Sequence, residues 1–262
     1  MKNEEWKTFL PYVIACIALG IGTFYDYQLT HALYQSMPLV SSFFERLMLI
    51  PLLSVVAITL VVEAIVKKSK PYLGVAYFAC LYVVYDAMQY WFYEINVWMI
   101  LTLFVLAGAY LFIIYVLTKN ISPYQLEKRL PFLQFFSKTL ITSLFISVVI
   151  KYFWGRIRYR DLLHVSDYTP WYVINGVNGN YSFPSGHTTC FTTILCLLEY
   201  KENRFMNSSV FKQVVIWGLI VLMPIARMMA GAHYLSDTAV GFMITYSCYL
   251  YYRYQYRKRG LL

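Results

Sequence analysis

The sequence predicts an all-α protein, a polytopic bundle of transmembrane helices. Hydrophobic residues make up 60% of the 262 residues and charged residues only 13%, whereas soluble domains carry about 25% charged residues. Aromatic residues contribute 19% and include 26 Tyr, which suits a membrane interface because Tyr has a polar tip and an apolar body. The five Cys lie in apolar runs without a Cys-x-x-Cys pair, so neither a disulfide framework nor a zinc site is indicated.

Apolar runs of roughly 17 to 25 residues are long enough to cross a bilayer as helices. The chain contains eight such runs, at about 9–25, 47–66, 73–93, 97–118, 132–153, 184–200, 211–230 and 232–252. No internal repeat or low-complexity segment interrupts them. We therefore expect about eight spans in a single membrane domain that covers residues 1–262.

The basic residues predict the orientation of the spans. If the N-terminus is cytoplasmic, most of the 22 Lys and Arg fall on the cytoplasmic side, and the outer side keeps Arg46, Lys151, Arg156, Arg158, Arg160 and Arg227. An excess of Lys and Arg in cytoplasmic loops is the usual bias, so both termini are expected inside. This distribution also accounts for the net charge of +9. We expect no nucleic-acid partner, because no soluble segment carries a basic patch interleaved with aromatic residues.

A short polar turn, Pro-Ser-Gly-His at 184–187, begins the sixth run. Pro184 suits the first position of a helix because its φ is fixed and its missing N–H would have no intrahelical partner there. Ser185, Gly186 and His187 would then lie in the first turn, where free N–H groups attract an anion. The turn predicts a seat for a phosphate beside a group that can hold a proton, although alone it could be a simple helix cap.

Two further groups of polar residues stand at the ends of apolar runs. Lys151 and Arg158 are seven residues apart, which places them on one face if the helix continues. Arg227, His233 and Asp237 follow later, and the last two can meet across one helical turn. Considered alone, Lys151 and Arg158 could be cations that extend to the membrane interface. His233 and Asp237 could likewise form a purely structural hydrogen bond. By the span count all these ends lie on the outer face, which favours one common site.

The ordered pattern Lys-x6-Arg, Pro-Ser-Gly-His and Arg-x5-His-x3-Asp between residues 151 and 237 resembles the three signature motifs of the type 2 phosphatidic acid phosphatase (PAP2) superfamily. Two positions depart from the usual motifs. Tyr159 stands where a Pro usually follows the Arg, and Ala226 replaces a Ser whose hydroxyl would be one possible phosphate donor. The resemblance implies a six-helix core, and hence either two additional N-terminal helices or a re-entrant segment among the first four runs. The N-terminal spans are expected in 1–131 and the catalytic spans in 132–252.

The resemblance also implies a role for each residue of the site. His233 would be the nucleophile that forms a phosphohistidine, Asp237 would hold its tautomer, and His187 would protonate the leaving oxygen and then activate water. The phosphate would be held by cations and helix N-terminal donors, namely Lys151, Arg158, Ser185, Gly186 and Arg227. No metal or other cofactor is expected, because three cations supply the electrostatic stabilisation that Mg²⁺ gives in other phosphoryl transfers.

Aromatic residues of the outer loop, Trp154, Tyr168, Trp171 and Tyr172, predict a site at the height of lipid headgroups. The expected substrate is a lipid phosphate such as phosphatidic acid, phosphatidylglycerophosphate or a polyprenyl diphosphate, and membrane lipids are the other expected partners. A bacterial cytoplasmic membrane fits the compact chain, with the active site extracytoplasmic. The oligomeric state is open. The main alternative is a lipid-headgroup transporter or flippase that uses the basic cluster without hydrolysis; a catalytically silent scaffold is a third.

Four other titratable residues lie outside these motifs. Asp86 and Glu63 lie within apolar runs and are functional candidates by default, although a buried hydrogen bond to a Tyr would explain Asp86 equally well and Glu63 could sit at the inner boundary. His31 and His164 are expected in outer loops without partners.

Overall fold

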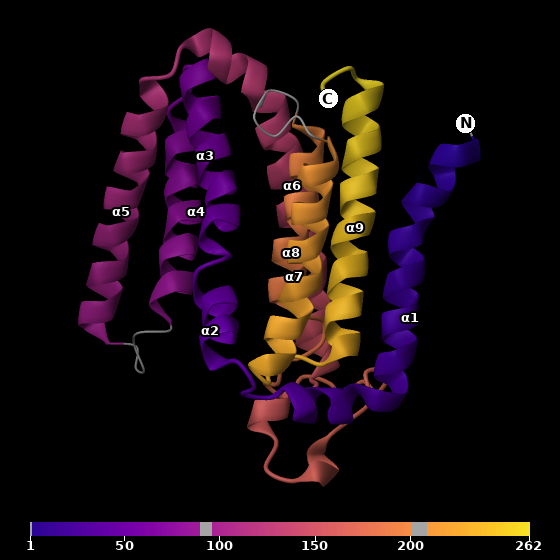
Figure 1. Ribbon diagram of the computed structural model, residues 1–262. Coiled ribbons are helices and arrows are strands. Elements are labelled where there is room, and N and C mark those ends of the chain that lie inside the picture. The colour runs from indigo at the N-terminus through magenta and orange to yellow at the C-terminus, as the bar shows by residue number, and fades with distance from the viewer. Residues whose placement is uncertain (1, 90–95, 201–208) are drawn as a thin grey trace. The chain divides into compact units, whose positions relative to one another are not determined.

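The computed structural model describes residues 2–89, 96–200 and 209–262, and in these segments every regular element is helical (Figure 1). The prediction of an all-α protein is therefore confirmed. The long helices are α1 (Lys2–Leu33), α3 (Ile50–Val66), α4 (Pro71–Met88), α5 (Val97–Lys119), α6 (Pro123–Trp154), α8 (Ser209–Met229) and α9 (Leu235–Lys258). Shorter elements complete the order, namely α2 (Pro38–Arg46), the 3-10 turns η1 (Tyr159–Asp161) and η2 (Val165–Asp167), α7 (Gly186–Thr192) and the 3-10 helix η3 (Thr193–Glu199).

Six helical segments of the described chain are long and apolar enough to cross a membrane, judged by length and composition. They are Thr8–Leu33, Pro38–Val66, Pro71–Met88, Val97–Lys119, Pro123–Asp161 and Val210–Met229. These segments are consistent with a multi-pass membrane protein. Two of the eight predicted spans are helical without meeting this criterion. The run 184–200 is divided between α7 and η3, and α9 contains many Tyr, Ser and Thr and is less apolar than the six segments.

Some sequence predictions concern residues outside the described segments. The end of the predicted run 73–93 and the basic residues Lys201 and Arg204 belong to this group.

The chain divides into two compact units, 46–140 with 251–262 and 1–45 with 141–250. In the first of these, α3 packs against α4 and α5 (Figure 1). The contact is lined by small buried residues, among them Ala57, Ala76, Cys80 and Ala107, all 0% exposed. Small side chains let helix backbones approach closely, which is the usual source of helix association in membranes.

Polar side chains in this unit find partners within it. Thr59 and Ser137 form a buried hydroxyl pair at 2.7 Å. The Glu63 carboxylate accepts from Gln134 and lies 3.3 Å from the Lys67 ammonium. Asp86 accepts from Gln89 Nε2 at 3.0 Å, so among the described residues its carboxylate has an amide partner.

The second unit contains α1, the end of α6, α7, η3, α8 and most of α9. Hydrogen bonds from Tyr12 to Ser247 and from Tyr246 to the backbone of Thr8 join α1 to α9. α7 packs closely on α9 at Gly241, where a Cβ would lie 2.7 Å from the backbone oxygen of Ser185. This close packing places the start of α7 against the start of α9, where the polar motifs lie.

Candidate active site

The polar motifs meet at one end of this unit, where α6 and α8 end and α7 and α9 begin. Backbone hydrogen bonds join the segments: Arg160 N–H donates to Gly231 O, Ser182 N–H to Arg156 O, and Ser185 N–H to Asp237 O, each at 2.9 Å. The predicted convergence of four helix ends is therefore seen in the structure. The turn between α8 and α9 needs Gly231, because its φ is +62° and an added Cβ would lie 2.7 Å from the Tyr34 ring.

His233 is buried at 2% exposure in the turn before α9. Its Nδ1 lies 2.6 Å from the Ser182 carbonyl oxygen and 3.8 Å from Asp237 Oδ2. A carbonyl oxygen can only accept, so Nδ1 carries the proton and Nε2 keeps a lone pair. Burial lowers the pKa of His233 well below its usual range, which keeps the imidazole neutral at pH 7. The predicted one-turn contact with Asp237 is present, and the Ser182 carbonyl makes the shorter contact.

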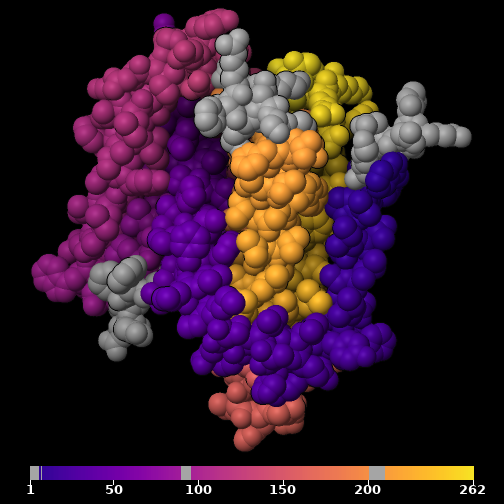
Figure 2. Space-filling model, in the orientation of Figure 1, coloured from indigo at the N-terminus to yellow at the C-terminus, as the bar shows by residue number. Residues whose placement is uncertain are grey.

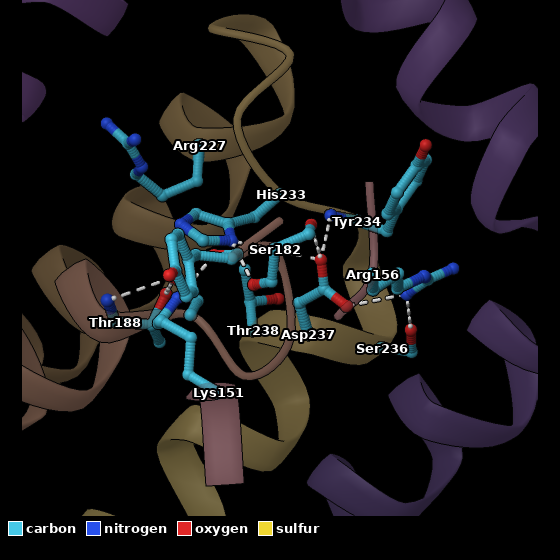
Figure 3. A network of polar contacts seen from close by, with 12 residues as sticks. Lys151, Arg156, Ser182, Thr188, Arg227, His233, Tyr234, Ser236, Asp237 and Thr238 are labelled. Carbon is cyan, nitrogen blue, oxygen red and sulfur yellow. Dashed lines mark hydrogen bonds and ion pairs between the residues drawn. The ribbon is translucent and has the colours of Figure 1, made fainter. Parts of the chain in front are cut away.

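Asp237 is fully buried and accepts hydrogen bonds at both carboxylate oxygens (Figure 3). Oδ2 accepts from the Ser182 hydroxyl at 2.5 Å and from the Tyr234 N–H at 2.9 Å. Oδ1 lies 2.5 Å from Arg156 Nη1. These contacts satisfy a carboxylate that would otherwise be costly to bury, and they fix its position beside His233.

Arg156 connects Asp237 to α1. Its guanidinium is 0% exposed and also lies 3.0 Å from Asp26 Oδ2, while Nη1 donates to the Ser236 hydroxyl at 2.9 Å. The same guanidinium stacks 4.1 Å from the centroid of the Tyr234 ring, a favourable cation–π geometry. The first helix of the chain therefore supplies a carboxylate to the group that holds Asp237.

The Pro-Ser-Gly-His turn begins its helix two residues later than predicted. α7 starts at Gly186 with Ser185 as its N-cap, and Pro184 lies before the cap after a cis peptide bond. The prediction that Pro184 is the first helical residue is wrong, because Ser185 is extended and its side chain accepts from the Thr188 N–H at 3.3 Å. The Ser185 N–H donates to Asp237 O. Of the two phosphate donors expected on Ser185, only the hydroxyl is therefore left.

Lys151, His187 and Arg227 lie around His233. His187 and His233 are each within electrostatic range of Lys151 and Arg227. Lys151 Nζ donates to the Tyr181 carbonyl oxygen at 2.6 Å, and its Cε would lie 3.9 Å from a Cβ on Gly186. The structure thus brings Lys151, at the end of α6, to the first turn of α7, and Figure 3 shows Lys151 and Arg227 near His233.

Arg227, at the end of α8, is 2% exposed. Its Nη2 lies 3.2 Å from Glu45 Oε1, and this oxygen is also 3.2 Å from Arg160 Nη1. The backbone oxygen of Glu45 accepts from His187 Nε2 at 3.1 Å. Because this acceptor is a carbonyl, the Nε2 of His187 carries a proton and Nδ1 keeps the lone pair.

A comparison with family models places this constellation among known proteins. Residues 133–261 match the model described as the PAP2 superfamily. This half of the chain belongs to the PAP2 superfamily. The membership indicates a phosphatase that acts on phosphate esters, and it confirms the resemblance predicted from the motifs. Searches of curated proteins and of solved structures gave no match.

The two departures from the usual PAP2 motifs have structural consequences. Ala226 is 1% exposed, so a buried methyl group takes the place of the usual hydroxyl. Tyr159 donates to or accepts from His31 Nδ1 at 2.6 Å, and its ring packs edge-on against Tyr34 at 5.1 Å. The expectation that His31 lies in a loop without a partner is wrong, since His31 belongs to α1 and Tyr159 binds it.

Arg158 follows α6 and is half-buried, within electrostatic range of Lys151. All the predicted PAP2 site residues therefore lie in one unit of the chain. Four contributors were missed by sequence reasoning, namely Asp26, Glu45, Arg156 and Ser182. Asp26 lies directly after the predicted run 9–25 and inside the helical segment Thr8–Leu33, and an ionisable residue within a span marks a functional candidate. Glu45 and Ser182 offered none, since each is identified only by the residues it contacts in the fold.

Proposed function

We propose that the protein is a membrane lipid phosphatase that hydrolyses a phosphomonoester or diphosphate through a phosphohistidine, without a metal ion. The single observation that carries this proposal is the environment of His233. Its Nδ1 is held by the Ser182 carbonyl at 2.6 Å, which leaves Nε2 as a nucleophile among Lys151, Arg227 and His187. A buried, neutral imidazole beside a cluster of basic side chains suits attack on a phosphate.

The reaction would proceed in two steps. Burial lowers the pKa of His187 in the structure, and the negative charge of a bound phosphate would favour uptake of a second proton at its Nδ1. Nε2 of His233 then attacks phosphorus as the bond to the leaving oxygen breaks, and His187 gives its Nδ1 proton to that oxygen. Water then attacks the phosphohistidine, neutral His187 accepts the water proton at Nδ1, and the nitrogen–phosphorus bond breaks to release inorganic phosphate. Lys151, Arg158 and Arg227, with Gly186 N–H and the Ser185 hydroxyl, offset the charge on the equatorial oxygens.

Aromatic residues beside the site support a lipid substrate. Trp154 Nε1 donates to the Trp171 carbonyl at 2.6 Å, and both rings pack against Phe183, with centroids 4.5 and 6.2 Å away. Tyr172 is exposed in the same loop. Such residues concentrate at membrane interfaces, so we place the phosphate of phosphatidic acid, phosphatidylglycerophosphate or a polyprenyl diphosphate at this height, with the chains between the helices.

The distribution of Lys and Arg supports an extracytoplasmic site with cytoplasmic termini. A bacterial cytoplasmic membrane remains the proposed location, with membrane lipids as the surrounding partners.

The test measures phosphate release from a panel of lipid phosphates in detergent with a chelator present. His233→Ala should lower turnover by about 10³-fold or more, because the nucleophile is lost. His164→Ala removes an exposed imidazole of the outer loop and should leave turnover unchanged. Undiminished release from His233→Ala would remove the nucleophile assignment. Lipid transfer between leaflets of proteoliposomes by a wild type that releases no phosphate would favour the flippase.

A further inference from the structure

Glu45 lies near the end of α2, a helix that no motif includes. The N-terminal segment reaches the end of α8 through a hydrogen bond from Gln35 N–H to Met229 O at 2.9 Å. Figure 2 shows this segment, in indigo, beneath the lower end of α8, in orange. Phe44 is 6% exposed and packs edge-on against Phe191 of α7 at 6.1 Å. The position of Glu45 is therefore fixed by packing on both sides.

The carboxylate of Glu45 forms ion pairs with two arginines. One oxygen, Oε1, lies 3.2 Å from both Arg227 Nη2 and Arg160 Nη1. The Glu45 side chain is 14% exposed, and the Arg227 side chain only 2%. A buried guanidinium requires an anionic or hydrogen-bonding partner. Glu45 supplies such a partner to Arg227.

A carboxylate oxygen and a phosphate oxygen are the same kind of acceptor for a guanidinium. A phosphate that reaches Arg227 must therefore replace the Glu45 carboxylate or share the arginine with it. Sharing places two anions side by side, which is unfavourable. In either case the negative charge of Glu45 weakens the binding of an anion to the cation cluster.

We propose that Glu45 is a resident anion of the phosphate site, which holds Arg227 in place and sets the affinity of the site for phosphate. The inference rests on the proposed function, because it takes Arg227 as a phosphate ligand. Glu45 is a positioning and affinity-determining residue and forms no bond to phosphorus. Its carboxylate favours release of the product phosphate, because the ion pair between Glu45 and Arg227 forms again as the phosphate leaves.

The test is the affinity of the full-length protein in detergent for inorganic phosphate, measured by calorimetric titration at constant ionic strength. Glu45→Gln keeps the shape of the side chain and removes its charge. The dissociation constant for phosphate should fall about tenfold, since an ion pair at this distance outweighs a neutral hydrogen bond by at least that factor. Inhibition of turnover by inorganic phosphate should strengthen by the same factor.

Asp161→Asn is the matched control, because Asp161 is an exposed carboxylate next to Arg160 in the chain. Asp161→Asn removes one negative charge from the loop that carries Arg160. The dissociation constant for phosphate should stay within about twofold of the wild-type value, as expected for a screened surface charge. An equal tightening in both variants would show that overall charge, and not the contact with Arg227, sets the affinity.

Glu45→Asp is the second variant. Aspartate keeps the charge but is one methylene shorter, so its contact with Arg227 weakens and the phosphate constant should fall between those of the wild type and Glu45→Gln. If Glu45→Gln does not fold, as judged by size-exclusion profile and thermal unfolding, Glu45→Asp decides the question. Phosphate binding that is unchanged or weaker in the folded variant would overturn the inference.

The binding measurement needs no turnover, so the two proposals can fail separately. A wild type that hydrolyses lipid phosphates while Glu45→Gln binds phosphate no more tightly would overturn only the inference about Glu45. A tighter Glu45→Gln in a protein that hydrolyses no lipid phosphate would overturn only the proposed function.

Discussion

Replacing Arg156 with Met should destabilise the protein strongly. The guanidinium lies 3.0 Å from Asp26 and 2.5 Å from Asp237, and all three side chains are 0% exposed. Met replaces the aliphatic part of the Arg side chain and has no charge, so two buried carboxylates would be left without their cation. Breaking a buried ion pair from one side costs about 3–5 kcal/mol, and the loss of the cation–π contact with Tyr234 at 4.1 Å acts in the same direction.

The assay is the thermal unfolding midpoint of the purified protein in detergent. A loss of this size corresponds to a fall of about 6–20 °C for a chain of about this length. Arg259→Met removes an exposed arginine near the C-terminus and should change stability by no more than about 0.5 kcal/mol. Adding Asp26→Asn to Arg156→Met neutralises one stranded carboxylate, so the double variant should recover part of the loss.

The reasoning would be refuted if Arg156→Met unfolded within about 1 kcal/mol of the wild type, because a buried, charge-paired guanidinium cannot be that dispensable. It would also be refuted if the double variant lost as much as the sum of the two single variants, since residues of one ion-pair network should be coupled.

Two further predictions concern the residues around His233. Ser182→Ala removes a hydrogen bond to Asp237 at 2.5 Å but keeps the backbone carbonyl that binds His233. We expect the free energy of unfolding to fall by about 1.5–3 kcal/mol, which an unfolding experiment measures. Steady-state kinetics should show reduced turnover at a nearly unchanged Michaelis constant. Burial lowers the pKa of His233 well below 6.5, so below pH 6.5 the unfolded chain binds a proton that the folded protein does not, and stability should decline as the pH falls. His233→Gln should lose less stability than the wild type between pH 7.5 and 5.5, and equal losses would contradict this assignment.

Much of the site was accessible from the sequence because its motifs obey local rules. His233 and Asp237 are four residues apart, and one helical turn brings such residues together. Ser185 precedes an apolar run, as N-cap residues do. The exact start of α7 was not accessible, because Ser185 caps the helix through Thr188 and its own N–H bonds to Asp237 O in another helix.

The contacts that hold the candidate catalytic groups could not be predicted from the sequence. Asp26 and Arg156 are 130 residues apart, and Glu45 and Arg227 are 182 apart. No periodicity relates such residues, and an isolated charge in an apolar run shows only that it needs a partner. Which partner it has depends on how the helices pack.

The sequence by itself determined that this chain is a helical membrane protein of the PAP2 type, because hydropathy over a bilayer thickness and short polar motifs are local properties. Only the tertiary structure decided that α1 and α2 contribute Asp26 and Glu45 to the site and that Arg156 holds Asp237. The physical reason is that buried charges choose their partners by distance in space, and helix packing alone sets those distances.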